Sequence, residues 1–147
     1  MIDVYAPVGL FKLRSERAIG ERLTKAVLRA EGVSPRASLQ LDNTAAFIHI
    51  LPASRLQTAA SSGAQAVPVQ VLTPPSALSR DGQNELVREI TEMIASVVGD
   101  STLQQRTWVP LTEAVPGGWR ISDTWCFDST LIHSTERCRS RTVAGYE

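Results

Sequence analysis

The sequence has no excess of charge of either sign and few residues of the kinds that bind metals. Fifteen basic residues balance fifteen acidic ones, so the formal net charge at pH 7 is zero. A neutral chain has no overall field that attracts nucleic acid or anionic membranes, and we expect neither partner. The spacing of Cys126 and Cys138 fits no zinc signature, and His49 and His133 are too scattered to complete one. We therefore expect no metal or other cofactor, and we expect the thiols to be reduced.

The sequence also lacks the apolar segments that export or membrane insertion requires. No stretch reaches the roughly 20 apolar residues of a transmembrane helix. Asp3 stands where a secretory signal would carry positive charge before a long apolar run. We expect a soluble cytoplasmic protein with one compact core, because 147 residues can bury most of their apolar surface without disulfides.

The first part of the chain has the pattern of a strand, a helix and a second strand. Residues 2–6 are mostly β-branched or aromatic and precede a turn, which predicts a strand. Apolar residues recur at spacings of three and four over residues 15–31, which predicts an amphipathic helix closed by Gly32. Residues 47–51 predict the second strand. His49 lies inside it and is interpreted as a hydrogen-bonded core residue rather than a catalytic one.

The same order then recurs further along the chain. Residues 67–72 predict a strand, and residues 82–98 predict an amphipathic helix that ends at Gly99. An offset of 67 residues aligns buried and turn positions of the two halves: Val4 with Val71, Pro7 with Pro74, Ile19 with Leu86, Leu23 with Ile90, Thr24 with Thr91 and Val27 with Ile94. A match confined to such positions is typical of two diverged copies of one unit.

These patterns predict an α/β (α+β) domain over residues 1–128. It would contain two tandem βαβ units, 1–58 and 66–128, joined by a flexible linker at 59–65. Two such units make a four-stranded sheet with both helices on one face, so self-association is expected to cover the other face. Residues 129–147 have no sustained periodicity and are expected to form a C-terminal arm or a partly disordered tail.

Several segments resemble the tautomerase superfamily, which includes 4-oxalocrotonate tautomerase and macrophage migration inhibitory factor. Residues 68–71 are similar to the opening strand of 4-oxalocrotonate tautomerase, and residues 85–91 are similar to its helix. Residues 108–113 followed by 117–119 resemble its second strand and the glycine-tryptophan turn. In length and fused layout the chain resembles the cis-3-chloroacrylic acid dehalogenase group. The resemblance implies a fold like that of macrophage migration inhibitory factor and a homotrimer.

The family's chemistry uses an amino-terminal proline, whose amine acts as a base or nucleophile. Here Ile2 is the second residue, and a bulky second residue should leave Met1 in place. The free amine would then belong to Met1, which is the candidate catalytic group. Pro68 is the matching proline of the second unit, but its nitrogen is part of an amide and cannot act as a base. It is interpreted as a strand-opening residue.

Other family residues are also replaced where the resemblance places them. The family's arginines fall at Leu10, Pro74, Ala77 and Trp108, its first-helix histidine at Val27 and its strand tyrosine at Pro110. Because alignment can slip at loops, Arg80 and Arg106 remain candidates for binding a carboxylate by bidentate pairing, with solvated surface arginines as the alternative.

Five further residues have two interpretations each. Trp108 and Trp119 could wall an apolar pocket or form the core of a subunit interface. Glu113 could act as an acid or make a structural hydrogen bond. Lys12 and Arg14, expected near Met1, could attract an anionic ligand or remain solvated.

Two functions follow from these residues. The first is a trimeric scaffold with a degenerate or repurposed pocket and no proline-based catalysis. The second is a weak tautomerase, isomerase or lyase acting on a small keto or unsaturated carboxylic acid, with Met1 as the base and Arg80 or Arg106 holding the carboxylate.

Overall fold

The fold is taken from a computed structural model of the chain, which describes residues 1–12, 15–34, 36–60, 65–118, 120–121 and 124–125. The expectations for the arm at 129–147 lie outside these described residues. So do those for Arg14, Trp119, Cys126, His133 and Cys138.

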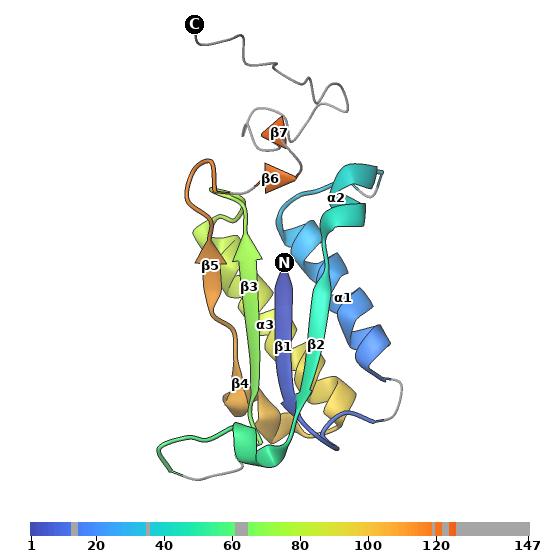
Figure 1. Cartoon of the computed structure of the whole chain (residues 1–147), viewed down its shortest axis with the longest axis vertical. Coiled ribbons are helices and arrows are strands. Elements are labelled where there is room, and N and C mark those ends of the chain that lie inside the picture. The colour runs from blue at the N-terminus through green and yellow to red at the C-terminus, as the bar shows by residue number, and fades with distance from the viewer. Residues whose placement is uncertain (13–14, 35, 61–64, 119, 122–123, 126–147) are drawn as a thin grey trace, which may run out of the picture.

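The regular elements follow the predicted order (Figure 1). The first half contains strand β1 (Ile2–Pro7), helix α1 (Ser15–Ala30) and strand β2 (Ala46–Leu51). The second half contains strand β3 (Val67–Thr73), helix α3 (Arg80–Val98) and strands β4 (Thr107–Trp108) and β5 (Leu111–Glu113). The sequence had not indicated helix α2 (Ser38–Asn43), the 3-10 helices η1 (Ala53–Arg55) and η2 (Ser101–Arg106), or the hairpin of β6 (Arg120–Ile121) and β7 (Thr124–Trp125).

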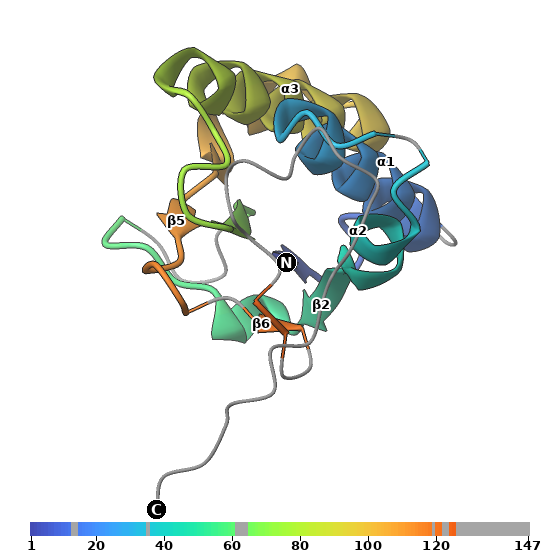
Figure 2. The same ribbon diagram turned by 90° about the horizontal axis from the view of Figure 1, so that it is seen from above.

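The strands pair as two parallel units that meet in an antiparallel junction. Their order is β2-β1-β3-β4, and β5 also pairs with β3. Strand β1 is parallel to β2, β3 is parallel to β4 and β5, and β1 is antiparallel to β3. Figure 2 shows α1 and α3 together on one side of this sheet. The predicted fold class is therefore confirmed.

The predicted strand over residues 108–113 is interrupted. Pro68 faces Trp108 and Val71 faces Leu111, so the register is the same on both sides of the break. Pro110 lies between β4 and β5. It has no N–H to donate, although its carbonyl oxygen accepts a hydrogen bond of 3.1 Å from the Val71 N–H. Proline thus divides this strand without shifting its register.

The sheet register explains the internal repeat. An offset of 67 residues maps Asp3 onto Gln70 and Ile2 onto Val69. In the sheet, Asp3 lies directly opposite Gln70, whereas Ile2 lies opposite Val71. A two-fold axis through the Asp3–Gln70 pair therefore relates the two units. The surroundings of Met1 at one end of the sheet correspond to those of Pro68 at the other.

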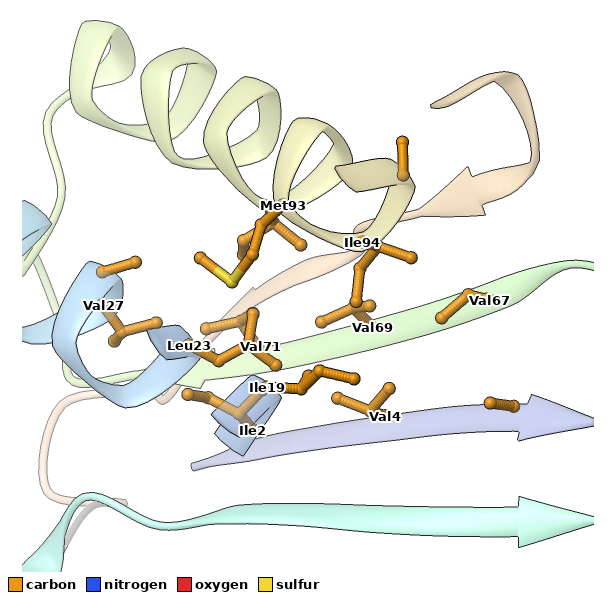
Figure 3. Close-up of a cluster of buried hydrophobic side chains, with 14 of the residues drawn as sticks. Ile2, Val4, Ile19, Leu23, Val27, Val67, Val69, Val71, Met93 and Ile94 are labelled. Atoms are coloured by element: carbon orange, nitrogen blue, oxygen red, sulfur yellow. The ribbon is translucent and has the colours of Figure 1, made fainter. Parts of the chain in front are cut away.

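The hydrophobic core lies between the sheet and the two long helices (Figure 3). Alternate strand residues point toward α1 and α3, as the period of two in a strand requires. Eight core side chains have no exposed surface: Ile2, Val4, Ile19, Leu23, Val69, Val71, Ile90 and Ile94.

The intervening strand residues point to the opposite side, which none of the described helices covers. We call this side the open face. It carries Asp3, Tyr5, Phe47, His49, Pro68, Gln70, Leu72, Trp108, Pro110 and Thr112. Two of its aromatic residues, Phe47 and Trp108, are 48% and 44% exposed.

Candidate functional site

The antiparallel pairing of β1 and β3 gives the sheet two distinct ends. At one end lie Met1, the end of β3, the last turn of α1 and the start of α3. We call this the Met1 end. The start of β3 and of β4 and the turn after β1 lie at the other, the Pro68 end. A strand of six residues spans about 20 Å, so groups at the two ends of one chain do not meet.

The Met1 amine is held in the sheet. It donates a hydrogen bond of 3.0 Å to the Leu72 carbonyl oxygen, and the Leu72 N–H donates one of 2.9 Å to the Met1 carbonyl oxygen. On the other side, the Ile2 N–H donates to the Ala45 carbonyl oxygen at 2.9 Å. The backbone around the amine is therefore fixed by both neighbouring segments, while Met1 itself remains 42% exposed.

Helix α1 brings a carboxyl group to the same place. It runs back along β1, with Ile19 and Leu23 over the strand and Val27 beyond its start (Figure 3). Glu31 follows Val27 by one turn, about 5.4 Å further along the axis, and the Glu31 N–H donates to the Val27 carbonyl oxygen at 2.9 Å. Gly32, with φ of 67°, then ends the helical path. Glu31 is thus directed toward Met1, and it is partly buried.

Each of these two groups changes the pKa of the other. Burial lowers the pKa of the Met1 amine below its ordinary value of 8.0, and the negative charges of Glu31 and Asp3 oppose that shift. Burial raises the pKa of the Glu31 carboxyl to about 7, although the positive amine acts in the other direction. The two groups therefore titrate close together near neutral pH, where one can supply a proton and the other can accept one.

A second polar cluster lies next to the amine on the open face. Asp3 Oδ1 and His49 Nε2 are 2.8 Å apart, and the Tyr5 and His49 rings stack with centroids 4.6 Å apart. The His49 side chain is 39% exposed. His49 is thus hydrogen-bonded as expected, but it lies on the open face and not in the core.

Two of the sequence candidates lie at the Met1 end. Arg80 is the first residue of α3 and is exposed. Glu113 ends β5 and accepts a hydrogen bond from the Ser76 N–H, in the loop between β3 and α3. Ser76 has φ of 57°, which is uncommon for a residue with a side chain, so Glu113 secures a strained turn.

The remaining described candidates lie at the Pro68 end. Arg106 donates to Gln65 O at 2.6 Å and to Asp100 Oδ2 and Thr102 Oγ1 at 2.9 Å each. Trp108 lies beside Pro68 on the open face. Within one chain, Met1, Arg80 and Glu113 are therefore separated from Arg106 and Trp108.

The expectation that Lys12 lies near Met1 is wrong for a single chain. Lys12 follows the turn at the far end of β1, and the whole strand separates it from the amine. The sequence had placed the turn beside the chain start, but an extended strand carries the two apart.

Glu31 was missed by the sequence interpretation, which treated it only as the last residue of a helix. A carboxylate at a helix C-terminus is unfavourable because it faces the negative end of the helix dipole. A crossover helix also ends beside the start of the strand that precedes it. These two signals together could have identified it.

A separate groove lies between α1 and α3. It encloses about 380 Å³ and is lined by Arg22, Lys25, Arg29, Glu89, Glu92, Met93 and Ser96. Arg29 and Glu89 form an ion pair in it, so its opposite charges largely satisfy each other.

The described residues contain no group of three histidine, cysteine, aspartate or glutamate side chains placed to hold a metal ion. None of the described helices is long and apolar enough to cross a membrane.

Comparison with known proteins places the fold. No protein-family model matches the sequence, and no curated protein matches it significantly. Solved structures match closely in shape. A structure titled as a symmetric trimer of wild-type fused 4-OT has a TM-score of 0.69 at 16% sequence identity, over 83% of this chain and 91% of the other.

Two further structures support the same fold. Pt0534 inactivated by 2-oxo-3-pentynoate has a TM-score of 0.63 at 16% identity, over 80% of this chain and 93% of that one. N1, of the cis-3-chloroacrylic acid dehalogenase family, has a TM-score of 0.58 at 22% identity, over 79% and 75%. The fold implied by the sequence resemblance is thereby confirmed as that of fused tautomerase-superfamily structures.

Proposed function

We propose that this chain, which has the fused tautomerase fold, is a tautomerase-superfamily protein without proline-dependent catalysis that assembles as a soluble, cytoplasmic homotrimer. One observation carries the proposal: the amine at the start of β1 belongs to Met1, and the charged side chain that α1 directs toward it is Glu31. A secondary amine and a facing cation, which suit general-base attack on a keto acid, are replaced by a primary amine and a carboxyl group.

The open face supports the assembly. Its exposed Phe47 and Trp108 lie on a sheet surface that no described helix covers, and large aromatic residues gain most when they are buried in an interface. Several of the matching fused 4-OT structures are titled as trimers. A second and third copy of the chain would cover this surface.

The decisive experiment inserts a proline between Met1 and Ile2. Removal of the initiator methionine then leaves a proline at the place of Met1, without disturbing the buried Ile2 side chain or its bond to Ala45. We expect less than about a tenfold gain in phenylpyruvate or 2-hydroxymuconate tautomerisation, because a positioned base contributes 10²–10⁴-fold only in a site that also stabilises the enolate. Intact mass must confirm the new terminus. A gain of a thousandfold would mean that the site is otherwise competent and would overturn the proposal.

A weak tautomerase, isomerase or lyase acting on a small keto or unsaturated acid is the second candidate. It is favoured by the lowered pKa of the Met1 amine and by the position of Arg80 at the same end of the sheet. In this alternative the amine acts as the base and Arg80 holds the carboxylate. An Arg80→Ala variant would then raise KM for phenylpyruvate about tenfold or more, whereas in the scaffold proposal no turnover is measurable in either protein.

A further inference from the structure

We propose that the Met1 amine and Glu31 form a site that reversibly captures small uncharged aldehydes or ketones as an imine, with Glu31 as the proton donor. This inference rests on the Met1-centred site of the proposed function but not on the trimer or on the absence of tautomerisation.

The first step of the argument is the amine itself. A primary amine can condense with a carbonyl group, and the product keeps a C=N bond that a hydride can reduce. The Met1 nitrogen is fixed by its hydrogen bond to the Leu72 carbonyl oxygen, so it is presented at one place, and Met1 is exposed enough for a small molecule to reach it.

The second step is the position of Glu31. Helix α1 directs its side chain to the amine, one turn beyond Val27, and Gly32 ends the helix there. Burial keeps a large fraction of this carboxyl protonated at neutral pH, while burial of the amine increases its neutral fraction. The reactive combination, a neutral amine beside a neutral acid, is therefore populated near pH 7.

The chemistry then balances without another reactant. The amine nitrogen attacks the carbonyl carbon, and transfer of one nitrogen proton to the carbonyl oxygen gives a carbinolamine. Glu31 donates its proton to the carbinolamine hydroxyl, which leaves as water while the nitrogen lone pair forms the C=N bond. The products are a protonated imine, one water and the Glu31 carboxylate, whose charge stabilises the new cation.

Charge defines the class of ligand. Glu31 and Asp3 both place negative charge near the amine, and both interact with its positive form. A ligand carboxylate would be repelled by these groups, whereas an uncharged carbonyl compound would not. We therefore infer a preference for neutral aldehydes and ketones over keto acids and aldehyde acids.

The experiment measures reductive labelling of the full-length chain, with the Met1 terminus confirmed by intact mass. Propanal is the neutral probe, glyoxylate is the anionic probe, and cyanoborohydride is kept in excess so that imine formation limits the rate. The sequence contains only two lysines, Lys12 and Lys25, so peptide mapping compares three amines in one sample. Preference for Met1 alone is not sufficient, since any α-amine is less basic than lysine.

The Glu31→Gln variant separates proton donation from simple electrostatics. If Glu31 is the donor, Met1 labelling by propanal should fall about tenfold or more at pH 7, with labelling of both lysines unchanged. If Glu31 only perturbs the amine, loss of its negative charge lowers the amine pKa further, and labelling should stay equal or become faster. That outcome would overturn the proposal. Glu21→Gln, on the exposed side of the same helix, is the matched control and should label as the original chain does.

The anionic probe tests the charge preference. Relative to Lys25, Met1 should react less with glyoxylate than with propanal, and Glu31→Gln should narrow this difference. An identical ratio for both probes would refute the selection of neutral ligands. A trimer without tautomerase activity that also fails to label would leave the proposed function standing and remove only this inference.

Discussion

At the scale of single residues, the site depends on a carboxyl group in a place that local preference disfavours. Glu31 lies at the C-terminal end of α1, partly buried, and its pKa is raised to about 7. Helix dipole and burial both oppose a negative charge there. A residue that reduces stability and faces a reactive amine is more typical of a functional position than of a structural one.

Glu31→Gln should make the folded protein more stable at alkaline pH. The carboxyl titrates near 4.5 when unfolded and near 7 when folded, so the folded state binds more protons between these values. The free energy of unfolding that this group contributes is therefore intact below pH 4.5 and is lost as the pH rises through 7. At pH 8 the variant should gain about 2–3 kcal/mol over the original chain, and at pH 4.5 almost nothing.

Urea unfolding at fixed protomer concentration would measure this difference. Equal stability of the two proteins at pH 8 would show that Glu31 is not buried beside Met1.

At the scale of elements, the two long helices are positioned by their ends. Ser79 Oγ accepts a hydrogen bond of 3.1 Å from the Gly82 N–H and begins α3, and Gly99, with φ of 79°, ends it. These caps fix where Arg80 and the loop before it lie at the Met1 end. The edge strand opposite β2 is divided by Pro110, which removes one donor from that edge.

Ser79→Ala should lower the free energy of unfolding by about 1 kcal/mol, because the Gly82 N–H loses its acceptor at the first turn. Ser96→Ala, at an exposed position within the same helix, is the control and should be neutral or slightly stabilising. Chemical denaturation of both variants gives the comparison. A loss of similar size in both would mean that the cap does not determine the start of α3.

At the scale of the whole molecule, one sheet serves both units. The two-fold axis through Asp3 and Gln70 makes the chain a near repeat, yet only one end carries a free amine. The helices cover one side of the sheet, and the open face presents aromatic side chains. A homotrimer that covers this face would also bury the Asp3–His49 pair.

Phe47→Lys and Trp108→Lys should each shift the assembly from trimer toward monomer, because a lysine on the open face would have to be desolvated in the interface. Val115→Lys, at a position that is 71% exposed and off the open face, should leave the trimer intact. Size-exclusion chromatography with light scattering at micromolar concentration measures the mass. If the unmodified chain itself is a monomer there, the proposed assembly is wrong.

The sequence by itself determined the elements and their order. Periods of two and of three to four residues, with glycine and proline at the ends, predicted β1, α1, β2, β3 and α3 to within a residue or two, because burial imposes those periods on any strand or helix. The offset of 67 residues carried the two-unit fold for the same reason. Tertiary structure alone decided which side chains share a site. It joined Glu31 to Met1, and it separated Arg106 and Trp108 from them, because the strands that carry these groups run in opposite directions across one sheet. Distance along the chain does not encode that direction; only the pairing of β1 with β3 does.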